Sequence, residues 1–598
     1  MTATLDLWPI GNCQVSALID RRGRFVWGCV PRVDGIPAFS SLLDDKPPAG
    51  EGARGFWEID LENCVATHQH YLRNTPVLVT RHEDAAGNAV EVIDFCPRFH
   101  RAGRMYRPVA YVRIVRPVSG SPRTRTRLRP SRDWGAADAH RTRGSNHIRY
   151  LLDELTLRLT TTAPVGWIES ERLFRVERPL HFFLGPDESF SDDIAAATEQ
   201  MLERTVAEWR QWSRGLATPM EWQEAVIRAA ITLKLCQHEE TGAIVAALTT
   251  SIPEHADSGR NWDYRYCWIR DAYYTVQALN RLGALDVLES YLEYLRNIVD
   301  NAKGGHIQPL YGVGGEALLV EQEKRSLNGY RGMGPVRAGN QAYEQIQHDA
   351  YGQIILSNAQ AFFDQRLYRV AGKEDFEALE AVGNLAWDVH DKPDAGLWEL
   401  RTRSHVHTYS VAMCWAACDR LANVAARLGL EARRAFWQDR ADTIRAAIEK
   451  AAWREETGSL SATFGGNDLD ASLIQLLDLR FLAPDDPRFQ GTLHAVEQGL
   501  RRGSHMLRYA TEDDFGLPTT AFNVCTFWLI EALHVTGRDA DARLLFEEML
   551  ERRTAAGLLS EDIDPVSGEL WGNYPQTYSL VGMINCAVML SKPWSAVR

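Results

Sequence analysis

The hydrophobic periodicity of the chain changes near residue 190, and this change most constrains the fold. Before it, short β-branched runs alternate with a period of two, as in Val77–His82 and Val90–Phe95, which flank the turn signal at residues 85–88. From Asp192 onward the period is helical. The sequence therefore predicts an antiparallel β-sandwich followed by helices, and 598 residues are enough for more than one domain.

Two segments connect these regular parts. Residues 119–144 are rich in Arg, Ser, Pro and Gly, a composition that predicts an exposed loop with solvated positive charge. Residues 192–214 place Leu202, Val206 and Trp209 on one side of a helical projection. We expect the second segment to be a helix that connects the two domains.

About twelve helical stretches follow the connecting helix. Charged stretches such as 431–452 alternate with apolar ones such as 519–532. This alternation suits two concentric layers, in which inner helices are buried all round and outer helices are exposed on one face. Twelve such helices predict an (α/α)6 barrel. The predicted spans are 221–237, 270–282, 285–301, 343–366, 374–390, 407–427, 431–452, 469–478, 487–501, 519–536, 539–553 and 576–590.

The change of period also sets the expected domain boundaries. We expect a β-sandwich over residues 1–190, a helical linker over 191–220 and a barrel that carries the active site over 221–598. The starts of the even-numbered helices would lie at one end of the barrel. Polar segments at those starts can therefore converge on one pocket.

Composition restricts the class of partner. The chain is 45% hydrophobic and 24% charged, with a formal net charge of −13, which argues against a broad basic surface for nucleic acid or anionic lipid. Residues 1–9 lack the basic and apolar regions of a signal peptide, and no apolar run reaches membrane-spanning length. We expect a cytoplasmic protein without membrane contact, and a homo-oligomer is compatible with the sequence.

The segment 261–271, Asn-Trp-Asp-Tyr-Arg-Tyr-Cys-Trp-Ile-Arg-Asp, alternates aromatic rings with charges that an ordinary core could not absorb. Rings bind the apolar faces of a pyranose, while Arg270 and Asp271 can bind its hydroxyls through charge-assisted hydrogen bonds. Segments 397–399 and 560–562 each add a carboxylate, and hydrolysis of a glycosidic bond requires two opposed carboxylates. The pattern indicates a sugar pocket; a structural Arg–Asp salt bridge is the simpler alternative.

Several further blocks, separated along the chain, share the order of one known family. They are 7–12, 20–23 and 27–32 near the N-terminus, then 261–271, 329–332, 339–342, 397–399 and 557–565. With these blocks the chain resembles glycoside hydrolase family 15, the glucoamylases and their bacterial trehalase-like relatives, over nearly its whole length. The first three blocks resemble the trehalase-like N-terminal domain of the bacterial members.

The resemblance implies roles for two carboxylates. Glu399, in Leu-Trp-Glu, resembles the general acid that protonates the leaving group, and Glu561, in Ser-Glu-Asp, resembles the general base that activates water. Asp562 directly follows the base, and spacing alone does not separate the two. An acid and a base standing roughly 6.5–9.5 Å apart admit a water molecule between them, so we expect inversion at the anomeric carbon.

The other residues implied by the resemblance bind the substrate. An Arg–Asp pair after a tryptophan holds glucose at the blind end of the pocket, a tyrosine lies near the anomeric centre, and further residues form the wall. In this sequence they are Tyr264, Trp268, Arg270, Asp271, Trp398, Tyr311 and Arg331.

The resemblance implies an inverting, exo-acting α-glucosidase of the glucoamylase type that releases β-glucose from maltodextrins. An α,α-trehalase is the alternative, and an isomaltose or dextrin glucohydrolase or an inverting phosphorylase are further ones. A phosphorylase would replace the base by a cationic phosphate cradle, whereas Glu561 is present. We expect no cofactor and no metal, since His405 and His407 are two residues apart and do not share a helix face.

Overall fold

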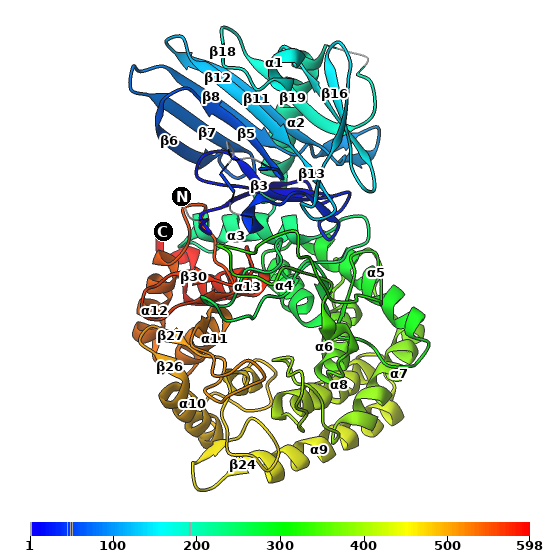
Figure 1. Cartoon of the computed structure of the whole chain (residues 1–598). Coiled ribbons are helices and arrows are strands. Elements are labelled where there is room, and N and C mark those ends of the chain that lie inside the picture. The colour runs from blue at the N-terminus through cyan, green and yellow to red at the C-terminus, as the bar shows by residue number, and fades with distance from the viewer. Residues whose placement is uncertain (1–2, 45, 48–49, 51, 191–192, 598) are drawn as a thin grey trace.

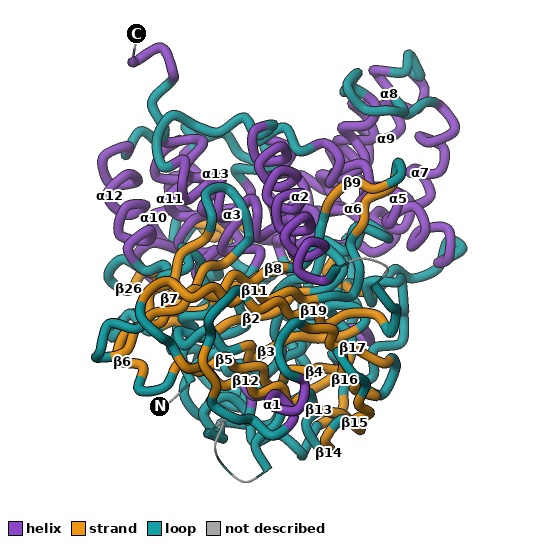
Figure 2. The backbone as a smooth tube through the Cα atoms, turned by 90° about the horizontal axis from the view of Figure 1, so that it is seen from above, coloured by secondary structure: helices purple, strands orange, loops and turns teal. Residues whose placement is uncertain are grey.

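The computed structural model describes residues 3–44, 46–47, 50, 52–190 and 193–597. A β domain lies against one side of a ring of helices (Figure 1). Seen from above, the strands gather on one side and the helices on the other (Figure 2). The fold is therefore the predicted one, an N-terminal antiparallel β domain followed by a helical barrel.

The smaller of the two large sheets has seven strands, all paired antiparallel. Its order is β1-β2-β3-β5-β12-β18, with β4 also paired to β3. Aromatic rings from this sheet pack between the two sheets; Phe25, for example, contacts Trp57 and Tyr111. The strands are β1 (Trp8–Gly11), β2 (Ser16–Ile19), β3 (Phe25–Val30), β4 (Ile36–Phe39), β5 (Phe56–Leu61), β12 (Arg123–Arg129) and β18 (Phe174–Arg175).

The second sheet has eight antiparallel strands, and its central strands bury both faces. Leu78 and Val90 face the first sheet, whereas Val79 and Ile93 face the connecting helix α2 (Ile194–Arg214). The alternation of side chains in a strand explains this division. In spatial order the strands are β15 (His140–Arg143), β16 (His147–Leu151), β17 (Thr156–Thr161), β19 (Leu180–Pro186), β11 (Tyr111–Ser119), β8 (Ala89–Phe95), β7 (Leu78–Asp84) and β6 (Cys64–Tyr71).

The prediction of an exposed loop over 119–144 is wrong, because this segment contains β12 and β15. In β12 the residues Thr124, Thr126 and Leu128 are buried. Arg127, between them, forms an ion pair with Glu58 of β5. The arginines therefore alternate with core positions at the period of a strand, and acidic partners on the neighbouring strand neutralise part of their charge.

Six helices form the inner layer of the barrel. Each contacts its two neighbours, and the last contacts the first, so the ring is closed. They are apolar on most sides because they are surrounded by protein. In order around the ring they are α4 (Ile269–Arg281), α6 (Asp349–Ala359), α8 (Thr408–Arg427), η4 (Ala471–Leu476), α11 (Asn523–Val535) and α13 (Thr577–Leu590).

The outer helices alternate with the inner ones along the chain, as the sequence predicts, and apart from the largely buried α3 they carry exposed charges. They are α3 (Gln223–Cys236), α5 (Leu285–Ala302), α7 (Lys373–Val389), α9 (Glu431–Ala452), α10 (Pro487–Leu500) and α12 (Asp539–Glu551). Among the residues that the structure describes, none of the helices combines the length and the apolar composition needed to cross a bilayer.

Two inner helices differ from their predicted spans. The span 469–478 forms only the 3-10 helix η4, which Asp470 caps by accepting a hydrogen bond from the Ser472 backbone. The span 343–366 shortens to α6, because the chain is extended at Gln345. The second difference occurs where the chain forms a wall of the pocket described below, at residues 340–345.

The β domain also supports one end of the barrel. The Trp27 indole donates to the carbonyl of Leu248 (2.8 Å), and the Tyr574 hydroxyl donates to the carbonyl of Leu7 (2.8 Å). We retain residues 1–190, 191–220 and 221–598 as proposed domains, since β19 ends at Pro186 and α3 starts at Gln223. Residues 191 and 192 lie outside the described part of the chain.

Candidate active site

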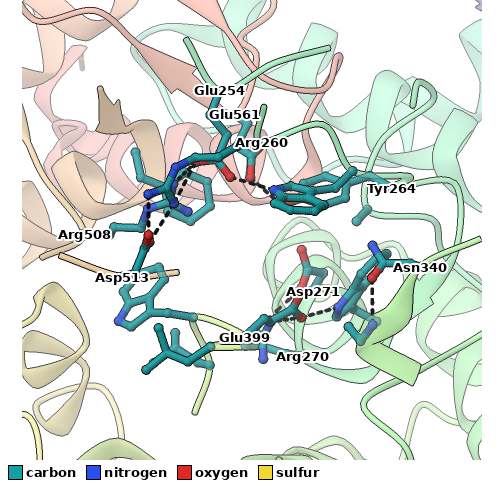
Figure 3. Close-up of a pocket in the computed structure, with 18 of the residues that line it drawn as sticks. Glu254, Arg260, Tyr264, Arg270, Asp271, Asn340, Glu399, Arg508, Asp513 and Glu561 are labelled. Carbon is teal, nitrogen blue, oxygen red and sulfur yellow. Dashed lines mark hydrogen bonds and ion pairs between the residues drawn. The ribbon is translucent and has the colours of Figure 1, made fainter. Parts of the chain in front are cut away.

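A pocket opens at the end of the barrel where the inner helices begin (Figure 3). It encloses about 860 Å³ of space that atoms do not fill, including a part open to solvent. Five parts of the chain supply its walls. They are 246–271, 340–345, 397–401, 508–522 and 561–578.

The motif 261–271 divides its side chains between the core and this pocket. Trp262 and Tyr264 line the pocket, whereas Asp263 and Arg265 are fully buried behind it and form a two-bonded ion pair of 2.7 and 2.8 Å. Arg265 also donates to the carbonyl of Gly35 in the β domain (2.6 Å). The charges of Asp263 and Arg265 thus neutralise each other in the core, and their contacts fix the segment that presents the rings.

Glu399 lies in a loop between α7 and α8 with a left-handed backbone, φ 61°. Its Oε1 accepts hydrogen bonds from the Trp268 indole (2.6 Å), from Arg270 Nη2 (3.2 Å) and from Gln347 Nε2 (3.4 Å). Three donors hold one oxygen in place. A proton on this carboxyl group is therefore best placed on the other oxygen, Oε2.

The loop of Glu399 is anchored at its start. Asp394 is buried, and its Oδ2 accepts from the His348 backbone (2.9 Å) and the Ser410 hydroxyl (2.8 Å). Gly396 has φ +69°, and a Cβ there would stand 2.8 Å from the ring of His407. Only glycine fits this turn without strain, so the direction in which the loop leaves Asp394 is fixed.

Glu561 enters the pocket from the opposite side and is 1% exposed. Its Oε1 accepts from the Tyr264 hydroxyl (2.6 Å), and its backbone is held by hydrogen bonds to Asn523 (3.0 Å) and Asn573 (3.2 Å). Desolvation raises the pKa of Glu561, while the Tyr264 hydrogen bond and the charge of Arg508 oppose the rise. Glu561 is thus a buried carboxylate with few partners, as an acceptor of a proton from water should be.

Asp562 is also fully buried but does not line the pocket. Burial and the adjacent Glu561 raise its pKa well above the ordinary value. Adjacent residues of an extended segment point to opposite sides. The sequence alone does not separate Glu561 from Asp562. Because Glu561 lines the pocket and Asp562 does not, we favour Glu561 as the carboxyl group that faces a substrate.

An aromatic pair lies between the two glutamates. The rings of Tyr264 and Trp268 meet edge to face with centroids 5.3 Å apart. Tyr264 binds Glu561 and Trp268 binds Glu399. Figure 3 shows Glu399 with Arg270 and Asp271 on one side of the pocket and Glu561 on the other, so the carboxyl groups are opposed.

Arg270 and Asp271, in the first turn of α4, form the inner wall. Arg270 Nη1 donates to Gln347 (2.8 Å) and to Asp349 (3.4 Å), so the guanidinium is locked. Asp271 is buried, and desolvation together with the nearby Glu399 and Glu561 raises its pKa to about 7. A sugar hydroxyl that donates to Asp271 would stabilise its ionised form.

The part of the pocket on the side of Glu561, which we call its mouth, is lined by paired charges (Figure 3). Arg260 donates to both oxygens of Asp513 (2.6 and 2.7 Å), and Arg508 forms an ion pair with Glu254. Glu254 also accepts from the indole of Trp262 (2.9 Å). Each of these cations has an acidic partner, so the mouth offers hydrogen bonds without a net charge that would select an ionic ligand.

These features agree with the protein family whose sequence model matches the chain. The sequence model described as "Glycosyl hydrolases family 15" matches residues 221–588. The chain belongs to glycoside hydrolase family 15. It is therefore a glycoside hydrolase, and the predicted family and enzyme class are confirmed.

Similar proteins align with nearly the whole length of this chain. A trehalase of Mycolicibacterium smegmatis is 31% identical, over 98% of this chain and 90% of its own. A trehalase of Thermoplasma volcanium is 30% identical, over 98% and 93%. Among solved structures, a bacterial glucoamylase in complex with acarbose has a TM-score of 0.68 at 13% identity, over 98% of this chain and 94% of its own. That structure supports the fold.

Most of the residues predicted for the family 15 site line the pocket. Trp398 does so too, and its indole donates to Asp470 (3.1 Å). Tyr311 and Arg331 are not among the described lining residues. Tyr311 lies on the short strand β21 (Leu310–Tyr311) behind Trp268, and Arg331 binds Glu569 (2.7 Å) beside the β domain. We therefore propose structural rather than substrate-binding roles for these two.

Two contributions were missed by sequence reasoning. Gln347 bridges Arg270 and Glu399, and Arg508 holds Glu254 at the mouth. A glutamine in an extended segment carries no local signal. The ion pair joins residues 254 positions apart, so spacing could not indicate it.

Proposed function

We propose that this family 15 enzyme is an α,α-trehalase that hydrolyses trehalose with inversion. Relatives named trehalase cover 98% of the chain, the β domain included, and this coverage is the observation that carries the proposal. It favours the alternative over the glucoamylase-type activity on maltodextrins expected from the sequence.

In this proposal Glu399 is the general acid. Its Oε1 is occupied by three donors, so the proton sits on Oε2 and passes to the glycosidic oxygen as the bond to the anomeric carbon breaks. The leaving glucose departs with its own anomeric configuration unchanged. Asp271 and the inner wall hold the other glucose during this step.

Glu561 is the general base. A water molecule between Glu561 and the anomeric carbon transfers a proton to the carboxylate and attacks the face opposite the leaving group. The Tyr264 hydroxyl occupies Oε1 (2.6 Å) and directs the charge toward Oε2, which is buried without a hydrogen bond from the described protein. A water bound there would satisfy this oxygen.

The decisive experiment is proton NMR of the first products from trehalose, maltose and isomaltose. Inverting hydrolysis of trehalose gives one β-glucose and one α-glucose per turnover, and we expect kcat/KM for trehalose to exceed that for maltose at least about 100-fold. Equal or faster cleavage of maltose would refute the trehalase proposal and favour hydrolysis of maltodextrins instead. Two α-glucose molecules from each trehalose would refute inversion.

The carboxylate roles need a matched control. Glu561→Gln should abolish product from every substrate, whereas Glu569→Gln should retain it. Glu569 lies in the same part of the chain, and its side chain is 41% exposed and paired with Arg331. Full activity of Glu561→Gln would show that another group activates water.

A further inference from the structure

A second cavity occupies the barrel axis below the active site. Three inner helices contribute stripes with helical spacing, so that one side of each faces the axis. The cavity holds about 1120 Å³ of unfilled space, a part of it open to solvent. The stripes are Tyr274, Gln277 and Arg281 on α4, Val524, Trp528 and Glu531 on α11, and Tyr578, Val581 and Asn585 on α13.

Tyr578 lines both this lower cavity and the active site. Its ring contacts Tyr274 (centroids 5.2 Å apart) and Trp528 (6.1 Å), and Trp528 contacts Trp398 (6.2 Å) beside the acid loop. The two cavities are thus separated by one layer of aromatic rings. A ligand below this layer touches the same ring that borders the inner wall of the active site.

The lining of the lower cavity combines rings with charges of both signs. The charged lining residues are Arg281, Arg420, Arg480, Asp478 and Glu531. Burial raises the pKa of both carboxyl groups, and the charge of Arg281 opposes this rise. The Asn585 side-chain oxygen is buried without a hydrogen bond from the described residues. Aromatic rings, charged groups of both signs and an unsatisfied amide oxygen suit a polyhydroxylated ligand better than an apolar one.

We propose that the lower cavity binds a neutral monosaccharide, glucose being the one that the reaction supplies. Bound glucose contacts the lower side of the layer that contains Tyr578 and thereby slows turnover. Added glucose then acts in two ways. It competes with substrate in the active site, which raises KM, and it lowers kcat from the lower cavity.

The test is inhibition by unlabelled glucose during hydrolysis of a ¹³C-labelled disaccharide, trehalose or maltose, whichever is cleaved. The parent should show a rise in KM and a fall in kcat. In the double variant Arg281→Gln, Glu531→Gln, the fall in kcat should need at least tenfold more glucose, with the rise in KM unchanged. The matched control is Glu431→Gln, Arg434→Gln, an exposed ion pair on α9, and it should behave as the parent.

A constant kcat in the parent, or an equal fall in kcat in the double variant, would overturn the proposal. If the double variant does not fold, crystals of the parent soaked with glucose decide. Density for a hexose between Arg281 and Glu531 would support the site, and water alone there, with the active site filled, would refute it. The assay needs only hydrolysis, so this outcome is independent of which disaccharide is the substrate.

Discussion

The inner wall of the active site and its mouth are built differently. The inner wall uses residues on regular elements, such as the buried Arg270 and Asp271 in the first turn of α4, where hydrogen bonds to Gln347 and Asp349 hold Arg270. The mouth uses loop residues, Asp513 and Glu254, joined to arginines from distant segments. Regular elements hold side chains more rigidly than loops. In the proposed reaction we expect the glucose under attack to be bound at the start of this helix and the leaving group to be bound by the loop residues.

The largest effect should come from the two glutamates between these regions. Glu399→Gln and Glu561→Gln should each lower kcat on disaccharides at least about 10³-fold, because each removes a proton transfer. α-Glucosyl fluoride separates them, since fluoride leaves without a proton: Glu399→Gln should regain much of its rate on it, and Glu561→Gln should not. Rescue of the Glu561 variant alone would reverse the two roles.

A smaller loss should follow from moving the acid without changing it. Gly396→Ala places a Cβ 2.8 Å from the His407 ring at φ +69°, and we expect kcat to fall about 10- to 100-fold as the acid shifts. Gly429→Ala is the control, with φ +71° and no atom within 4 Å of the new Cβ. Stopped assays and thermal unfolding of both variants separate backbone strain from displacement. Equal kcat values in the two would show that the turn does not position Glu399.

At the mouth, the expected change is in KM. Asp513→Asn removes one charge of the two-bonded pair with Arg260 (2.6 and 2.7 Å) and should raise KM for the disaccharide about tenfold. α-Glucosyl fluoride has no second sugar, so its KM should stay within about twofold. Asp486→Asn breaks a similar pair with Arg488 at the start of α10, away from the pocket. This control should change neither KM value. An equal rise in both KM values would place Asp513 in the inner wall.

The sequence could predict the inner wall better than the mouth for a physical reason. The helical alternation and the motif 261–271 are local patterns, and they place Arg270 and Asp271 at a helix start without any tertiary information. The mouth depends on pairs such as Arg508 with Glu254, which only the folded chain brings together. The same limit explains the error over 119–144, where the partner of Arg127 lies 69 residues away on β5.

Asp394, which anchors the loop of the acid, should show its effect in stability rather than in rate. Burial raises the pKa of Asp394 to about 7, so its ionisation opposes folding: the stability it contributes is present below pH 4 and is lost as the pH rises toward 7. Asp394→Asn lacks this loss. Relative to the parent, the variant should therefore gain unfolding free energy between pH 4 and 7, by up to about 4 kcal/mol.

Chemical denaturation at several pH values measures this difference. Asn can still accept the hydrogen bonds from His348 and Ser410 through its amide oxygen, so kcat should change by less than about threefold. Asp442→Asn, at an exposed position on α9, should show no pH-dependent gain. A constant difference between the Asp394 variant and the parent would mean that Asp394 ionises as readily in the folded chain as in the unfolded one.

The smallest effect should come from Tyr311, which the sequence assigned to the substrate and the structure places behind β20 (Cys267–Trp268). Its hydroxyl accepts from the Gln308 backbone (2.9 Å). Tyr311→Phe should therefore lower stability by about 1 kcal/mol and leave kcat/KM within about threefold. Tyr264→Phe removes a hydroxyl of the same kind from the base (2.6 Å) and should lower kcat at least tenfold. A loss in the Tyr311 variant as large as that in the Tyr264 variant would mean that the rear face of the Trp268 strand, and not only its pocket face, acts on the substrate.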